Sequence, residues 1–152
     1  MATRNPKTTA QIAGHPIHPM LIPFPIAFLV STFVCDLIFW RTGNSAWSTA
    51  ALYLLGAAIL MAALAAVAGL MDFLGDERIR GLSAAWHHMI GNVVAVALAL
   101  FNWYWRYTGG AVIPWGLALS ALVVLILLYT GWQGWGMVYR GRVGVEEAPE
   151  QR

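Results

Sequence analysis

The four histidines of this chain fall in two pairs that could bring imidazole groups together. His15 and His18 lie three positions apart in a proline-rich segment, and His87 and His88 are adjacent at the start of a later apolar stretch. Imidazole binds haem iron and transition-metal ions through a ring nitrogen, and a carboxylate such as Asp72 can act as a further ligand or accept the second ring N–H. These residue types therefore predict either axial ligation of haem b or a small metal site.

Helical geometry ranks the candidate ligands. Neighbouring helical residues differ in direction by about 100°, so only one of His87 and His88 can face a given partner. Four small or polar residues continue the face of His88 at helical spacing: Asn92, Ala95, Ala99 and Asn102. Because this stripe should face the bundle interior, His18 and His88 are the leading candidates, followed by His15 and His87, with Asp72 as a ligand or as an acceptor. Gly91 leaves room beside the pair for a planar group or a close helix contact.

Three outcomes stay open for these histidines. At most one haem is expected, since the opposite half of the chain's spans contains no histidine. A metal ion could use the histidines and Asp72, although the single cysteine, Cys35, lies elsewhere in an apolar run. In the third outcome the histidines cap helix ends and anchor among lipid headgroups, with no bound cofactor.

The elements that must position these residues are apolar helices. Of the 152 residues, 59% are hydrophobic and 11% are charged, against about 25% charged in soluble domains. Hydropathy and length predict four membrane spans, at about 21–40, 49–74, 86–105 and 114–138. We expect an all-α integral membrane four-helix up-down bundle over residues 15–140, between polar tails at 1–14 and 141–152. Pro23 and Pro25 should kink the first span, and regular helix is doubtful between residues 15 and 25.

The basic residues predict the orientation of the bundle. An even number of spans places both tails on one side, and that side carries seven basic residues: Arg4, Lys7, Arg78, Arg80, Arg140, Arg142 and Arg152. The other side carries only Arg41 and Arg106. Since positive charge is retained in the cytoplasm, the sequence predicts a multi-pass protein of the bacterial inner membrane with both termini inside.

Polar residues within the spans are expected to support the bundle. An unpaired Asp36 in an apolar helix would be costly, so Arg41 or Arg106 is its expected partner. Asp36 is 18 residues from His18, about 27 Å of helix, which favours an ion pair over a proton wire. Asn92, Thr130 and Gln133 are expected to form hydrogen bonds inside the bundle.

Several classes of function find no support in the sequence. No nucleophile and base pair or phosphate-binding loop indicates an enzyme, and the small net charge of +2 does not favour nucleic acid. The partners we expect are the lipid bilayer and other membrane subunits or further copies of the chain. An accessory subunit without a bound ligand is the alternative to a haem or metal protein, because small residues at Ala58, Ala62 and Ala66 favour close helix packing.

The stretch GHPIHPMLIPFPIAF, residues 14–28, resembles the opening signature of a bacterial membrane family catalogued as domain of unknown function 2231. The likeness continues through Asp36, the Gly-Leu-Met-Asp stretch ending at Asp72, the pair at residues 87–88 and the closing MVYRGRVGV. Many relatives look to have histidine where this chain has Pro23, so a ligand at that position cannot apply here. The resemblance implies a four-helix membrane domain and, loosely, a likeness to haem-binding membrane bundles.

Overall fold

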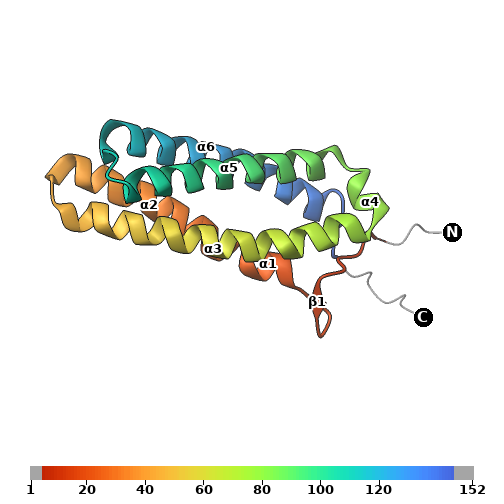
Figure 1. Cartoon of the computed structure of the whole chain (residues 1–152). Coiled ribbons are helices and arrows are strands. Elements are labelled where there is room, and N and C mark those ends of the chain that lie inside the picture. Colours follow the sequence, from red (N-terminus) through yellow and green to blue (C-terminus); the bar gives the residue numbers. More distant parts are fainter. Residues whose placement is uncertain (1–4, 146–152) are drawn as a thin grey trace, which may run out of the picture.

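A computed structural model describes residues 5–145 of the chain as a bundle of four long apolar helical segments (Figure 1). Their bounds are Ile17–Thr42, Ser45–Gly75, Ser83–Tyr107 and Val112–Tyr139. Each segment includes the corresponding range expected from hydropathy and extends beyond it at both ends. By length and composition, all four can cross a membrane.

The first segment consists of two helices, α1 (Ile17–Leu21) and α2 (Pro23–Thr42). Pro23 stands at the start of α2, where a backbone N–H would have no acceptor within that helix. The N–H of Ile22 still donates to the carbonyl of His18 at 3.1 Å across the junction. Helix therefore begins at Ile17, inside the proline-rich region where the sequence left regular helix in doubt.

A short turn joins α2 to α3 (Ser45–Gly75) and makes the two helices antiparallel neighbours. Gly43 ends α2 with a φ of 67°, and the Asn44 side chain caps α3 by accepting from the N–H of Ala46 at 3.0 Å. The helix ends before Asp76, whose side chain caps the single turn of α4 (Glu77–Arg80). Both turns use residues suited to helix ends.

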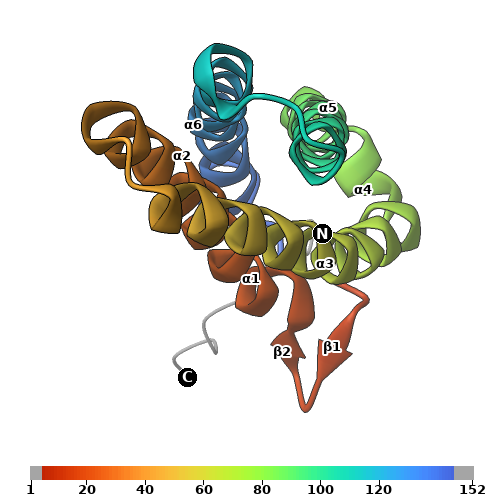
Figure 2. The same cartoon turned by 60° about the vertical axis from the view of Figure 1, so that its left-hand side comes forward.

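The second half of the chain repeats this antiparallel arrangement. It contains α5 (Ser83–Tyr107), a turn of π-helix η1 (Val112–Gly116) and α6 (Leu117–Tyr139). Ile113 has extended backbone angles, so the regular part of the last span starts after Pro114. α2 packs against α3 and α6, and α5 packs against the same two helices (Figure 2).

The bundle has two chemically different ends. The ends of the described chain meet at one of them, where the Asn5 side-chain amide donates to the carbonyl of Val145 at 3.0 Å. We call this the terminal end; it also contains α1, α4, the start of α5 and the last turns of α6 (Figure 1). The distal end contains the turns at 43–44 and 108–111. Histidines occupy only the terminal end.

Alanine, leucine and valine side chains fill the middle of the bundle. The central cluster is Leu29, Leu55, Ala58, Ala95, Ala99 and Val123. Large apolar side chains face outward instead, and Leu60, Leu125 and Leu128 are each more than 60% exposed. Helices that are apolar on the outside as well as within are suited to lipid surroundings.

Candidate functional site

His18 on α1 and His88 on α5 approach each other at the terminal end. Their ring centroids are 6.1 Å apart and the ring planes cross at 86°. Both side chains are partly buried. The two histidines that the sequence ranked first are thus the two that the fold brings together.

Each of these imidazoles is oriented by a backbone carbonyl. Nδ1 of His18 lies 2.8 Å from the carbonyl oxygen of Ala65 on α3, and Nδ1 of His88 lies 2.8 Å from that of Thr130 on α6. A carbonyl can only accept, so Nδ1 carries the hydrogen in both rings. In the neutral imidazole, Nε2 then keeps its lone pair. Within residues 5–145, neither Nε2 makes a hydrogen bond.

A glycine makes room for each ring. A Cβ at Gly69 would lie 2.9 Å from Nδ1 of His18, and a Cβ at Gly134 would lie 3.2 Å from Nδ1 and Cε1 of His88. Both glycines stand four residues after the residue whose carbonyl accepts from the ring. The same local construction is therefore built twice, once on α3 and once on α6, around two neighbouring imidazoles.

Polar contacts fix the position of His88 further. The Asn92 side-chain amide donates to the carbonyl of His88 at 2.7 Å, and the hydroxyl of Thr130 donates to the Asn92 carbonyl oxygen at 3.3 Å. A Cβ at Gly91 would collide with Cγ2 of Thr130, so this glycine permits a close helix contact rather than space for a ligand. α5 and α6 are thus joined at the level of the histidine pair.

The other two histidines lie apart from the pair. His15 is exposed in the hairpin formed by β1 (Gln11–Ile12) and β2 (His15–Pro16), where its Nδ1 is 3.0 Å from the carbonyl oxygen of Ala13. His87 is exposed on α5, with its ring centroid 6.4 Å from that of Tyr129. Neither His15 nor His87 has the contact that His18 and His88 share, a hydrogen bond from Nδ1 to the carbonyl of a neighbouring long helix.

Asp72 orders the N-terminal segment. Its Oδ1 accepts from the backbone N–H groups of Thr9 and Ala10, both at 2.7 Å, and the hydroxyl of Thr9 donates to the carbonyl of Met71 at 2.8 Å. A Cβ at Gly75 would collide with Thr9, so that glycine admits the segment. Among residues 5–145, no three His, Cys, Asp or Glu side chains converge as a metal site. The expected set of four histidines with Asp72 is therefore not assembled.

A second polar centre lies at the distal end. Asp36 on α2 and Arg106 on α5 form a buried two-pronged ion pair with both N–O distances at 2.7 Å. Ser120 on α6 donates to Asp36 at 2.6 Å and accepts from Arg106 at 3.0 Å, while Asn102 accepts from Nε of Arg106 at 2.9 Å. The expected partnership of Asp36 with Arg106 is confirmed. Every buried side-chain nitrogen and oxygen in the described chain has a hydrogen-bond partner, so this centre is a closed structural network.

Sequence reasoning missed the groups that support both centres. The carbonyls of Ala65 and Thr130 have no side-chain signature, and Ser120 lies 84 positions from Asp36. Gly69 and Gly134 offered a weak signal, since a glycine inside an apolar helix indicates close approach of another group. Gln133 differs from expectation: its side chain makes no hydrogen bond within residues 5–145.

The fold and its two polar centres define an all-α, four-helix membrane protein with a partly buried histidine pair at one end and a buried ion pair at the other. Residues 14–147 match the family described as predicted membrane protein (DUF2231). The chain belongs to that family. No curated protein and no solved structure matches the chain.

Proposed function

We propose that this protein binds haem b through His18 and His88 and carries single electrons within the membrane. The observation that carries the proposal is the matched pair of imidazoles, each with Nδ1–H on a helix carbonyl and Nε2 left free. That arrangement is typical of metal-ligating histidine, because the second ring nitrogen is usually held by a carbonyl or carboxylate.

The spacing of the rings suits a shared metal. Imidazole nitrogens bind a metal at about 2.0–2.1 Å, so two imidazoles that share an ion must lie close together. The observed separation is 6.1 Å. Gly69 and Gly134 leave space for the rings in this position, whereas alanine at either site would press on them.

The number of ligands favours haem over a bare metal ion. Bare zinc generally needs three or four protein ligands, and within residues 5–145 no third His, Cys, Asp or Glu joins the pair. Haem iron needs only two axial ligands from the protein, and its chemistry when so ligated is one-electron transfer. His18 and His88 would hold the haem, which would supply one-electron transfer.

The small-residue face of α3, which suggested an accessory subunit, is not available to bind another protein because most of it is buried within this chain. Ala58, Ala62 and Ala65 of the small-residue face of α3 are already buried inside the chain, where α2 packs on α3. Ala66 and Ala63 are exposed on α3, but they lie between the exposed larger side chains of Leu64 and Val67. The inner membrane is the proposed location, in agreement with the basic tails.

The test is the absorption spectrum of protein purified in mild detergent from haem-replete cells, together with elemental analysis for iron, zinc and copper. We expect a Soret band and sharpened bands on reduction, with about one iron per chain. His18→Ala and His88→Ala should lose the bands, while the matched variants His15→Ala and His87→Ala keep them. A stoichiometric metal without a Soret band would indicate that His18 and His88 bind a metal ion and not haem. A folded protein with neither haem nor metal would leave the accessory subunit as the better proposal.

A further inference from the structure

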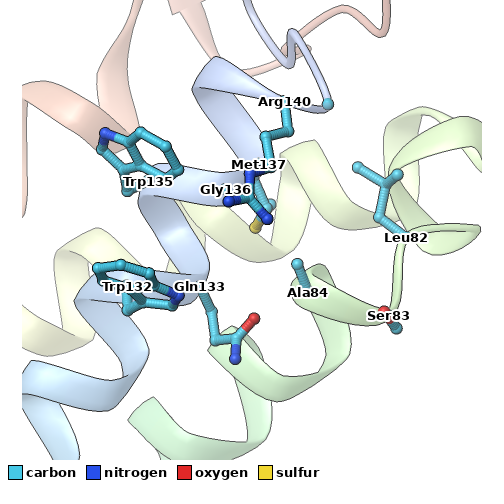
Figure 3. Close-up of a pocket in the computed structure, with 10 residues that line it drawn as sticks. Leu82, Ser83, Ala84, Trp132, Gln133, Trp135, Gly136, Met137 and Arg140 are labelled. Carbon is cyan, nitrogen blue, oxygen red and sulfur yellow. The ribbon is translucent and has the colours of Figure 1, made fainter.

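A cavity of about 360 Å³ opens at the terminal end between the start of α5 and the last turns of α6 (Figure 3). Neither His18 nor His88 lines this cavity, so it is separate from the histidine pair. Figure 3 shows Gln133 and Arg140 on the side of α6 nearer to Leu82 and Ala84. Ser83 lies at the α5 rim.

The described lining of the cavity offers hydrogen-bond donors and no acid. Arg140 supplies a guanidinium, Gln133 an amide and Ser83 a hydroxyl, and no Asp or Glu is among the described lining residues. Within residues 5–145, the side chains of Ser83 and Gln133 make no hydrogen bond and Arg140 forms no ion pair. A cluster of unpartnered donors around one positive charge suits an anion.

Two further features hold the positive charge at the cavity. The guanidinium carbon of Arg140 lies 5.4 Å from the ring centroid of Trp135, a cation–π contact that restricts the side chain. α5 begins at the rim with Leu82 at its cap position and no capping side chain, and the first residues of the helix, Ser83 and Ala84, line the cavity. The helix end adds to the field that Arg140 and Gln133 create.

The position of the cavity indicates where the anion comes from. Trp132 and Trp135 line it and are 68% and 46% exposed at the end of a helix that can span a membrane. Tryptophan gathers at the depth of lipid headgroups, and basic pockets between helices at that depth bind anionic headgroups. We infer that this cavity binds the phosphate of an anionic phospholipid headgroup, with Arg140 as the charged contact and Gln133 and Ser83 as neutral donors.

The inference is tested by native mass spectrometry of delipidated full-length protein titrated with phosphatidylglycerol, with phosphatidylcholine for comparison. We expect one tightly bound phosphatidylglycerol per chain. Arg140→Gln should weaken this binding about tenfold, as loss of a charged hydrogen bond to phosphate implies. Arg142 lies two residues after Arg140 and does not line the cavity. Arg142→Gln therefore removes an equal charge outside the site and should change the affinity for phosphatidylglycerol less than twofold. Equal losses in the two variants would overturn the site, because they would indicate general charge attraction.

A second variant keeps the test decisive if Arg140→Gln does not fold. Ala84→Leu fills the cavity from the α5 side without touching the charge, and it should also weaken phosphatidylglycerol binding. Unchanged binding in Ala84→Leu would place the lipid elsewhere and overturn the proposal.

A competition with glycerol 3-phosphate in the same titration identifies the source of the bound phosphate. If glycerol 3-phosphate does not displace phosphatidylglycerol, the site binds a lipid headgroup. Displacement at equal concentration would overturn the proposal in favour of a soluble phosphate ester. None of these results depends on haem.

Discussion

At the scale of single residues, each histidine of the pair depends on a glycine in a neighbouring helix. Glycine inside a helix costs about 0.5–1 kcal/mol relative to alanine, so its presence needs a compensating contact. At Gly69 and Gly134 that contact is the imidazole ring, which an added methyl group would push away from its position. Gly131, one turn before Gly134, faces open space and has no such role.

We expect Gly69→Ala and Gly134→Ala to disturb the histidine pair. The added methyl at Gly69 would lie 2.9 Å from His18, so the ring must move away from the carbonyl of Ala65. Overpacking of this kind costs about 1–3 kcal/mol, which thermal unfolding in detergent would detect. Gly131→Ala is the matched control and should be neutral or slightly stabilising. Equal stability of all three variants would show that the rings do not rely on these glycines.

At the scale of elements, the Asp36 network ties α2, α5 and α6 together at the distal end. Asp36 is fully buried and Arg106 nearly so, and each contributes to contacts between helices that are distant in sequence. Removing one partner from a buried pair leaves the other charge without compensation, whereas removing both does not. The network therefore contributes to helix registration more than to net stability.

Asp36→Asn should accordingly destabilise the bundle by about 3–5 kcal/mol, because the buried Arg106 loses its counter-charge. Asp36→Asn combined with Arg106→Gln should recover part of that loss. The measurement is the unfolding free energy in detergent, with exposed Arg41→Gln as the control for charge removal at the same end. If the double variant lost more unfolding free energy than the two single variants lose together, the uncompensated charge would not be the cause of the destabilisation.

The N-terminal segment is a second element held by carboxylates. The backbone N–H of Lys7 donates to Asp76 at 3.0 Å, and Arg78 forms an ion pair with the same carboxylate. The hydrogen bond from the Arg78 guanidinium, assisted by the N–H groups of Lys7 and Arg78, holds the pKa of Asp76 well below its usual range. The folded state thus binds a proton at Asp76 more weakly than the unfolded state does.

This pKa sets the pH dependence of the segment. Stability from a carboxyl with a lowered pKa is complete above its unfolded pKa of about 4 and declines as the pH falls below it. Hydrogen exchange at the Lys7 amide, corrected for intrinsic rates, should show equal protection at pH 7 and pH 5 and less at pH 3. Asp76→Asn should have weaker protection at pH 7 and a smaller change with pH. A drop in protection between pH 7 and pH 5 that persists in Asp76→Asn would assign the titration to another group.

At the scale of the whole molecule, polar groups are segregated to the two ends of an apolar bundle. The described parts of the chain's tails, α4 and the histidine pair share the terminal end, and only short turns connect the helices at the distal end. Arg106 is neutralised in its ion pair, so Arg41 is the one exposed basic residue of the distal end within residues 5–145. At the terminal end the described basic residues are Lys7, Arg78, Arg80, Arg140 and Arg142, while Arg4 and Arg152 lie outside the described residues.

We therefore propose that the terminal end faces the cytoplasm. Reporter domains fused after residue 152 and inserted at residues 108–110 should report opposite sides, with the carboxyl-terminal fusion active in the cytoplasm. Exchanging charge between the ends, with Arg78 and Arg80 replaced by Gln and basic residues inserted at the distal turn, should weaken or reverse this preference. A periplasmic carboxyl-terminal reporter in the native chain would reverse the orientation and move the histidine pair to the periplasmic side.

The number and type of helices follow from the sequence by itself. Long apolar runs must become helices in lipid, because no other local structure satisfies the backbone hydrogen bonds, and short connections make neighbours antiparallel. The stripe of Ala95, Ala99 and Asn102 on the face of His88 also indicated the buried side of α5, and all three are at most 1% exposed. Local composition and helical periodicity are sufficient for these features.

Only the tertiary structure decided which polar groups meet. Four histidines at one level left several pairings open, and the fold selected His18 and His88 because α1 continues along α3 while α5 packs on α6. Asp72 was a candidate ligand by residue type, yet its carboxylate accepts from the N–H groups of Thr9 and Ala10. Backbone carbonyls and N–H groups are present at every residue, so the sequence cannot show which of them will lie beside a given side chain.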